Sequence, residues 1–151
     1  MMNDEKWMRI ALDEARLARC EGEVPVGAVI VKDGEEIARA HNRCENDCDA
    51  TAHAERLAIS AACKRLGGKH LTGCTLYVTL EPCPMCAGAA IGARVDRIVY
   101  AAKDARAGAC ESLVRLPDYP LESHPTCHSG LLEEEAQKEL RGFFLKLRNQ
   151  K

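Results

Sequence analysis

The chain has 151 residues and a formal net charge of −2, with hydrophobic and charged fractions of 46% and 29%. This composition is typical of a globular domain and excludes disordered and collagen-like proteins. No apolar run approaches the roughly 20 residues of a membrane helix, and the first residues lack the apolar core of a signal peptide. We therefore expect residues 1–151 to form one cytoplasmic domain that contacts no membrane. Because the charge is nearly balanced, a nucleic-acid partner would have to bind a local patch.

The first third of the chain predicts a helix followed by a β-hairpin. Residues 4–20 place apolar side chains at three- and four-residue spacings between charged ones, which indicates an amphipathic helix. The β-branched run 26–31 and the segment 37–40 are typical of strands, and Asp33-Gly34 between them is a strong hairpin turn.

The middle third predicts two helices around a single strand. A polar loop over residues 42–50 leads into a helix that should begin near Thr51 or Ala52 and end at Gly67-Gly68. Residues 75–80 indicate a strand. Two prolines that suit the start of a helix then precede an Ala- and Gly-rich helix over 85–93.

The last third predicts a strand at 97–101, a proline-containing loop at 117–125 and a short strand at 126–129. A final helix carries one apolar stripe, made of Leu132, Ala136, Leu140, Phe143 and Leu147. This order of elements predicts an α/β fold with helices packed on both faces of a mixed sheet of about five strands.

Three residues have the chemistry of a zinc site, namely His53, Cys83 and Cys86. A catalytic zinc takes three protein ligands and leaves a fourth position for water. Cys83 and Cys86 lie three residues apart where a helix opens, so both sulfurs can point at one ion, and His53 lies in the first turn of another helix. The nine cysteines are an odd number without a secretion signal, which favours thiols and metal ligands over disulfides. Taken alone, Cys-x-x-Cys also fits a redox pair or half of a structural zinc site.

Glu55 is the predicted catalytic residue. It lies two residues from His53, a spacing at which both side chains can reach one site only at the end of a helix. A carboxylate beside a zinc-bound hydroxide can take its proton and deliver it to the substrate. Attack of that hydroxide on an amidine-like carbon, with loss of ammonia, is hydrolytic deamination. Cys44 and Cys48 in the preceding loop are the alternative source of a fourth ligand.

These residues resemble the signature of the zinc-dependent deaminases, in which His-x-Glu is paired with Pro-Cys-x-x-Cys. The chain looks most like the bacterial tRNA-specific adenosine deaminases, which convert the wobble adenosine of an anticodon to inosine. The similar segments run nearly end to end: Glu23-Val-Pro-Val-Gly-Ala-Val29, Thr51-Ala-His-Ala-Glu55, Leu76 to Ala89, Asp104 to Gly108, and Phe143-Phe144.

The resemblance implies the cytidine deaminase-like fold, a three-layer α/β/α sandwich, with one Zn²⁺ per chain, a homodimeric assembly and the tRNA anticodon loop as partner. It implies that Asn42 hydrogen-bonds the flipped base, that Ala54 contacts the substrate, and that Asp104 and Phe144 lie near the anticodon loop. Among the departures from the family pattern, Glu111 replaces a usual Gly and Ser123 replaces a usual Asn.

Other interpretations of the same residues stay open. The enzyme could deaminate a free base or nucleoside such as guanine, cytosine or adenosine, or the chain could be a non-catalytic RNA-binding module stabilised by zinc. Asn42 could simply cap a turn, and the Ala/Gly-rich helix could pack on the sheet without forming a dimer contact. The cationic residues of the last helix fit either a solvated face or a phosphate-binding surface.

Overall fold

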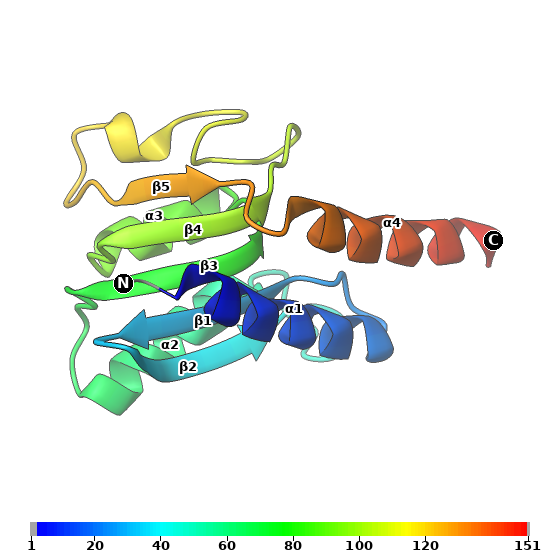
Figure 1. The fold of residues 1–151 in the computed structure, drawn as a ribbon, viewed down its shortest axis with the longest axis horizontal. Coiled ribbons are helices and arrows are strands. Elements are labelled where there is room, and N and C mark those ends of the chain that lie inside the picture. Colours follow the sequence, from blue (N-terminus) through cyan, green and yellow to red (C-terminus); the bar gives the residue numbers. More distant parts are fainter. Residues whose placement is uncertain (1–2, 151) are drawn as a thin grey trace.

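The computed structural model describes residues 3–150, which form a five-stranded sheet covered by helices on both faces (Figure 1). The strand order is β2-β1-β3-β4-β5, with β1 antiparallel to β2 and β3, and with β3, β4 and β5 mutually parallel. The strands are β1 (Gly27–Lys32), β2 (Glu35–His41), β3 (Cys74–Leu80), β4 (Arg97–Ala102) and β5 (Thr126–Ser129). The mixed sheet and its short fifth strand are confirmed.

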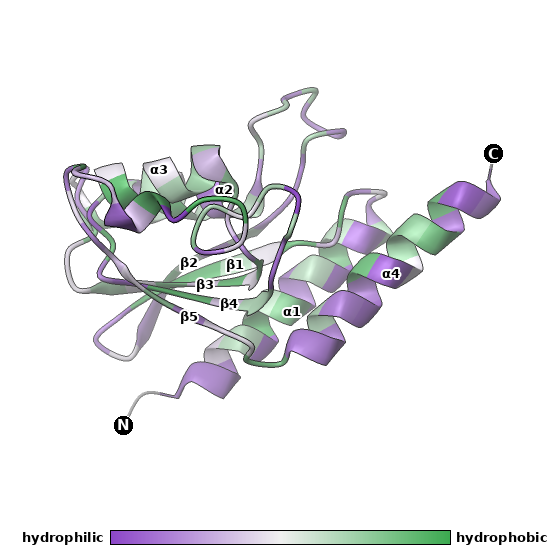
Figure 2. Cartoon of the chain, turned by 90° about the horizontal axis from the view of Figure 1, so that it is seen from above, coloured by the Kyte–Doolittle hydropathy of each residue, from purple (hydrophilic) through white to green (hydrophobic). Residues whose placement is uncertain are grey.

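The helices form two layers, seen on opposite sides of the sheet in Figure 2. Helices α2 (Ala54–Leu66) and α3 (Pro84–Gly92) cover one face, and α1 (Asp4–Cys20) and α4 (Glu133–Asn149) lie on the other. Each side of the sheet contributes to its own apolar core, because alternate side chains of a strand point to opposite faces. The three-layer α/β/α sandwich is confirmed. None of the described helices is long and apolar enough to cross a membrane.

The β-hairpin turns where the sequence predicts. Asp33 and Gly34 both have positive φ angles, 50° and 76°, which match the right-handed twist of the two strands. Beside this hairpin, α1 approaches β1 so closely that a Cβ on Gly27 would lie 2.0 Å from the carbonyl oxygen of Ala11. The six residues of the predicted apolar stripe of α1 are buried there, and Glu14 is buried with them.

Helix α2 begins later than predicted, at Ala54 and not at Thr51 or Ala52. His53 has an extended backbone, with φ −75° and ψ 149°, so it is the N-cap residue and does not lie in the first turn. The reason is a tertiary contact: the Oδ1 atom of Asn42 accepts the backbone N–H of Ala54 at 2.8 Å. One of the donors left unpaired at a helix start is thereby satisfied.

Helix α4 extends past the end of the sheet (Figure 1). Ala136 is its buried residue, and Leu147 at the far end of the predicted stripe is 44% exposed. Beyond Ala136 the helix is attached to α1 mainly by polar contacts. Glu139 accepts hydrogen bonds from Arg16 at 3.2 Å and Arg19 at 3.0 Å, and Arg19 lies so close to Gly142 that a Cβ there would be 2.6 Å from a guanidinium nitrogen.

Candidate active site

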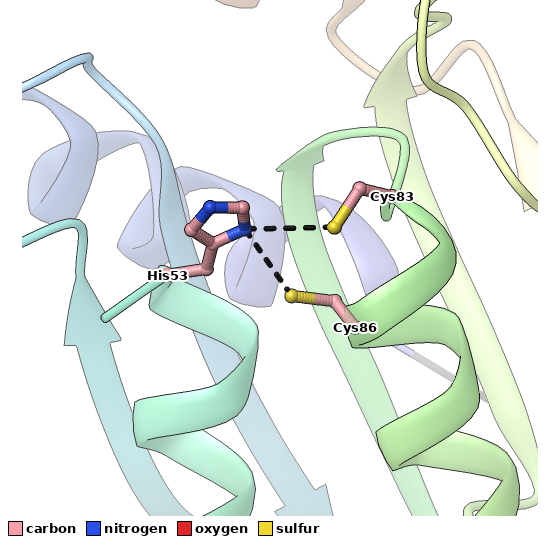
Figure 3. Close-up of side chains that lie close together, drawn as sticks. All are labelled: His53, Cys83 and Cys86. Atoms are coloured by element: carbon pink, nitrogen blue, oxygen red, sulfur yellow. Dashed lines mark hydrogen bonds between the residues drawn. The ribbon is translucent and has the colours of Figure 1, made fainter. Parts of the chain in front are cut away.

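The three predicted zinc ligands come together where α2 and α3 begin (Figure 3). The Nδ1 atom of His53 lies 3.6 Å from the Sγ atom of Cys83 and 3.4 Å from that of Cys86, and the three ligand atoms all lie within 4.8 Å of one another. Two ligands on a tetrahedral zinc with bonds of about 2.0–2.3 Å lie roughly 3.6 Å apart. The donor set and its spacing therefore fit one zinc ion.

The local sequence explains why the sulfurs converge. Pro84 is the first residue of α3 and Cys83 is its N-cap, in an extended conformation. Proline suits the first position of a helix because its φ is already helical and its missing N–H would have no partner there. Cys86 then lies in the first turn, buried and with its sulfur directed toward His53, which the start of α2 supplies (Figure 3).

The electrostatics of the cluster favour a thiolate. The pKa of Cys83 is lowered to about 4, first because the Cys86 thiol donates to it and then because His53 interacts with it. The same hydrogen bond, together with burial, raises the pKa of Cys86, and the bond to Cys83 raises the pKa of His53. A single negative charge is thus shared between two sulfurs next to an imidazole, which is a site suited to a soft divalent cation.

Glu55 lies beside this cluster, in the first turn of α2. Its side chain is buried, and burial raises the pKa of its carboxyl to about 7. The charge of His53 opposes this rise, and a hydrogen bond with Cys86 does so more weakly. A carboxyl with a pKa near neutrality can both accept and donate a proton, which is what general acid-base catalysis requires.

The site opens into a cavity of about 780 Å³. His53, Glu55 and Cys83 contribute to its lining, and its walls come from the loops after α1, β2, β3 and β4 and from α4. Carboxylates of Glu23, Glu45, Glu81 and Asp104 also line it, and none of the described lining residues is Lys or Arg. The cavity therefore suits a neutral ring better than a phosphate.

Three of the four predicted substrate contacts line the cavity, namely Asn42, Asp104 and Phe144. Phe144 is 46% exposed and packs edge-on against Phe143, with ring centroids 5.2 Å apart. Ala54 is different, since its side chain is fully buried and its N–H is taken by Asn42. A substrate contact from Ala54 stays a prediction.

The amide of Asn42 has a fixed orientation. The N–H of Ala54 can only donate, so the group that faces it must be the carbonyl oxygen Oδ1. The Nδ2 group of Asn42 is thereby left as a hydrogen-bond donor on the side chain that lines the cavity. Asn42 therefore caps the start of α2 with its oxygen, and its contact with a substrate base stays a prediction.

Two buried glutamates hold the loops around the cavity, and the sequence analysis did not single out either of them. Glu23 accepts the backbone N–H groups of Glu45 and Asn46 at 3.1 and 2.7 Å, and the Asn46 side chain at 2.6 Å. Burial opposes its charged form, yet these hydrogen bonds lower the pKa of Glu23. Glu81 does the same for the loop after β4, and its pKa is also lowered against burial by hydrogen bonds from that loop.

The two departures from the family pattern have structural partners. Glu111 accepts the hydroxyl of Tyr100 and lies 3.7 Å from the ammonium of Lys103, and it is not among the residues that line the cavity. Ser123 donates its hydroxyl to the carbonyl oxygen of Ile91 at 2.8 Å, in the last turn of α3. Both side chains are therefore engaged within the protein.

The remaining loop cysteines lie outside the metal cluster. Cys44 and Cys48 each donate a weak hydrogen bond of 3.8 Å to a carbonyl oxygen of their own loop. Within residues 3–150, the cluster of metal-binding side chains consists of His53, Cys83 and Cys86. A fourth protein ligand, as in a structural zinc site, is absent from that part of the chain.

The sheet order, the His-Cys-Cys cluster at two helix starts and the buried glutamate beside it define a zinc-dependent deaminase with the cytidine deaminase-like fold. The family model for the cytidine and deoxycytidylate deaminase zinc-binding region matches residues 1–102. This chain belongs to that family, and it therefore carries one zinc ion.

Individual relatives are similar over nearly the whole chain. A tRNA-specific adenosine deaminase of Aquifex aeolicus is 47% identical over 148 residues, which cover 98% of each protein. A solved structure from studies of A-to-I editing by tRNA:A34 deaminases at the wobble position of transfer RNA has a TM-score of 0.87 and 48% identity, and covers 89% of this chain and 99% of that one. The structure of a guanine deaminase from Nitrosomonas europaea has a TM-score of 0.79 and 26% identity, and covers 95% of this chain and 85% of that one.

Proposed function

We propose that this protein converts adenosine to inosine in tRNA by hydrolytic deamination, at the wobble position of the anticodon loop. The observation that carries the proposal is the buried carboxyl of Glu55 beside the His53, Cys83 and Cys86 cluster, in a cavity with no Lys or Arg among its described lining residues. The tRNA-specific adenosine deaminase of Aquifex aeolicus, 47% identical, supports tRNA as the substrate. We further propose that residues 1–151 act as one domain in the cytoplasm.

In the proposed reaction, His53, Cys83 and Cys86 hold the zinc. When bound, zinc supplies Lewis-acid activation of a water molecule near neutral pH. Glu55 accepts a proton from the attacking water and delivers it to the base, and the oxygen replaces the amino group, which leaves as ammonia. Asn42 holds the flipped base by donating from Nδ2, and the edge-packed pair of Phe143 and Phe144 forms the wall on which a neighbouring base can stack.

Cationic side chains for the RNA backbone lie along α4, outside the cavity. Lys138, Arg141 and Arg148 border a shallow apolar depression that Phe144 shares with the cavity. Within residues 3–150, these three side chains and Lys146 make no ion pair shorter than 4.0 Å, whereas Arg16 and Arg19 of α1 are paired with Glu139. Unpaired cations outside a cavity that has no Lys or Arg in its lining suit an extruded nucleotide whose phosphates stay outside.

The substrate test compares RNA with free bases. We expect inosine to form in an arginine tRNA transcript, and the rate to fall as salt rises from about 50 to 200 mM, roughly threefold for each phosphate that a cationic side chain neutralises. Arg141→Gln should weaken this salt dependence, and Glu35→Gln, an exposed change in the β-hairpin, should not. The alternative is deamination of a free base, which the related guanine deaminase fold supports. Salt-insensitive release of ammonia from guanine, with no inosine in tRNA, would establish that alternative.

We also propose a homodimer formed through the outward face of α3. Ala90 of this helix is fully buried in the core, so a large side chain there would disrupt the core and would not test a contact between subunits. The outward face instead presents Met85, Gly88 and Gly92. The segment 116–123 lies beside this face, because Leu116 is next to Gly88 and Ser123 is hydrogen-bonded to Ile91. In this segment Tyr119 and Leu121 are exposed.

Gly92→Arg is expected to convert the dimer to a monomer. A Cβ at Gly92 meets nothing within 4 Å, so the change adds bulk and charge to the outward face without touching the core. Gly68→Arg is the matched control, because Gly68 also has open space around it but lies after α2. Sedimentation at micromolar concentration measures both. A wild-type monomer, or a Gly92→Arg dimer, would contradict the proposed interface.

A further inference from the structure

Glu81 lies between the end of β3 and the metal cluster, and it is 2% exposed. Its carboxylate accepts hydrogen bonds from four backbone N–H groups and one hydroxyl of a single loop. The Oε1 atom accepts the N–H of Asp104 at 3.0 Å and the hydroxyl of Ser112. The Oε2 atom accepts the N–H groups of Cys110, Glu111 and Ser112 at 3.1, 2.8 and 2.9 Å.

This loop has no helix or strand of its own between β4 and the short helix Leu116–Asp118. Buried backbone N–H groups must nevertheless be paired, and here one carboxylate supplies the acceptors that a strand or helix would supply. The loop also fits closely around that carboxylate, since a Cβ on Gly108 would lie 2.3 Å from the Glu81 side chain. The shape of the loop therefore depends on Glu81.

The same loop forms one wall of the cavity. Asp104 and Ala107 line it, and the Oδ1 atom of Asp104 accepts the N–H groups of Arg106 and Ala107 at 3.0 and 3.3 Å, which closes a tight turn. The N–H of Asp104, at the base of that turn, is the one held by Oε1 of Glu81. Loss of this single bond would release the end of the loop that faces the cavity.

We propose that Glu81 is a positioning residue that holds residues 104–112 as the wall against which the substrate nucleotide binds. This inference rests on the proposed function for the identity of the substrate. A carboxylate is required because both oxygens accept. In a glutamine at this position, the carbonyl oxygen can accept the three N–H groups that Oε2 accepts in the wild type. The NH₂ group then faces the N–H of Asp104, and because both groups are donors this hydrogen bond is lost.

The test uses the zinc-loaded enzyme and an RNA hairpin with one adenosine at the wobble position. Glu81→Gln is expected to raise KM by about tenfold or more and to change kcat by less than about threefold, because the zinc and Glu55 are untouched while the wall is displaced. Gly108→Ala keeps the carboxylate but pushes the loop away from it, so it should give the same split between KM and kcat. The control is Glu35→Gln, an exposed change in the β-hairpin, which should leave KM within about twofold of the wild type.

The outcomes separate this inference from other possibilities. If Glu81→Gln loses both its zinc and its kcat, Glu81 acts on Cys83 and not on the loop, and the inference fails. An unchanged KM in both Glu81→Gln and Gly108→Ala would also overturn it. If neither variant folds, hydrogen exchange on the wild type decides, because slow exchange at Cys110, Glu111 and Ser112 is expected and fast exchange contradicts it. If the wild type deaminates no RNA, the proposed function fails, and the KM for a free base then tests the loop.

Discussion

The Glu55→Ala protein is expected to bind zinc as the wild type does and to lose deamination by at least roughly 10²–10⁴-fold. Glu55 is buried beside the metal cluster but is not one of its three ligands, so its removal leaves the ligand set intact. The missing group is the one that transfers the proton between the attacking water and the base. Single-turnover rates at saturating RNA measure this step without product release.

Glu55→Gln provides the matched comparison, because it keeps the size of the side chain and removes only its ability to carry a proton. We expect it to be as inactive as Glu55→Ala. Zinc content and circular dichroism confirm that both proteins are loaded and folded. Turnover near the wild-type rate in either protein would remove Glu55 from the mechanism.

Cys86→Ala is expected to lose the zinc ion and all measurable activity, with His53→Ala and Cys83→Ala behaving alike. Cys86 is fully buried, with its sulfur 3.4 Å from the Nδ1 atom of His53, and no fourth protein ligand in residues 3–150 can compensate for its loss. Because thiolate and imidazole ligands must be deprotonated to bind a metal, the wild type should also release zinc as pH falls. Metal analysis of the purified proteins measures the loss.

Cys44→Ala is the control for this set, since Cys44 lines the cavity but bonds only to its own loop. It should retain about one zinc per chain. Full zinc occupancy in Cys86→Ala would contradict the ligand assignment, and loss of zinc in Cys44→Ala would show that the loop supplies a ligand after all.

The sequence predicts most of the fold because its elements carry local signals. The apolar spacing of α1, the Asp33-Gly34 turn and the prolines before α3 each act within a few residues of the structure that they specify. The start of α2 is different. It depends on Asn42, 12 residues away, whose Oδ1 caps Ala54, and no local pattern indicates that contact.

The metal cluster is predictable for a similar reason, since the spacing of Cys83 and Cys86, and of His53 and Glu55, is a local pattern that can be recognised in the sequence. The loop anchors Glu23 and Glu81 leave none, because their partners are backbone N–H groups, which every residue except proline has. The only sequence signal is that a carboxylate stands next to a proline at an element boundary, Glu81-Pro82, and next to an apolar run at Glu23-Val24. Neither pattern distinguishes a buried anchor from a surface charge.

Past Ala136, α4 contributes only the partly buried Leu140 to the cores of the sheet, yet it supplies Phe143, Phe144 and Leu147 to the lining of the cavity. The residues of α4 that we propose as substrate contacts are therefore different from the residues that keep the protein folded. Substitutions along the outer turns of this helix can change substrate preference at little cost to the free energy of unfolding. Relatives that share the sheet and the metal cluster can thus diverge in substrate by exchanging one short helical tail.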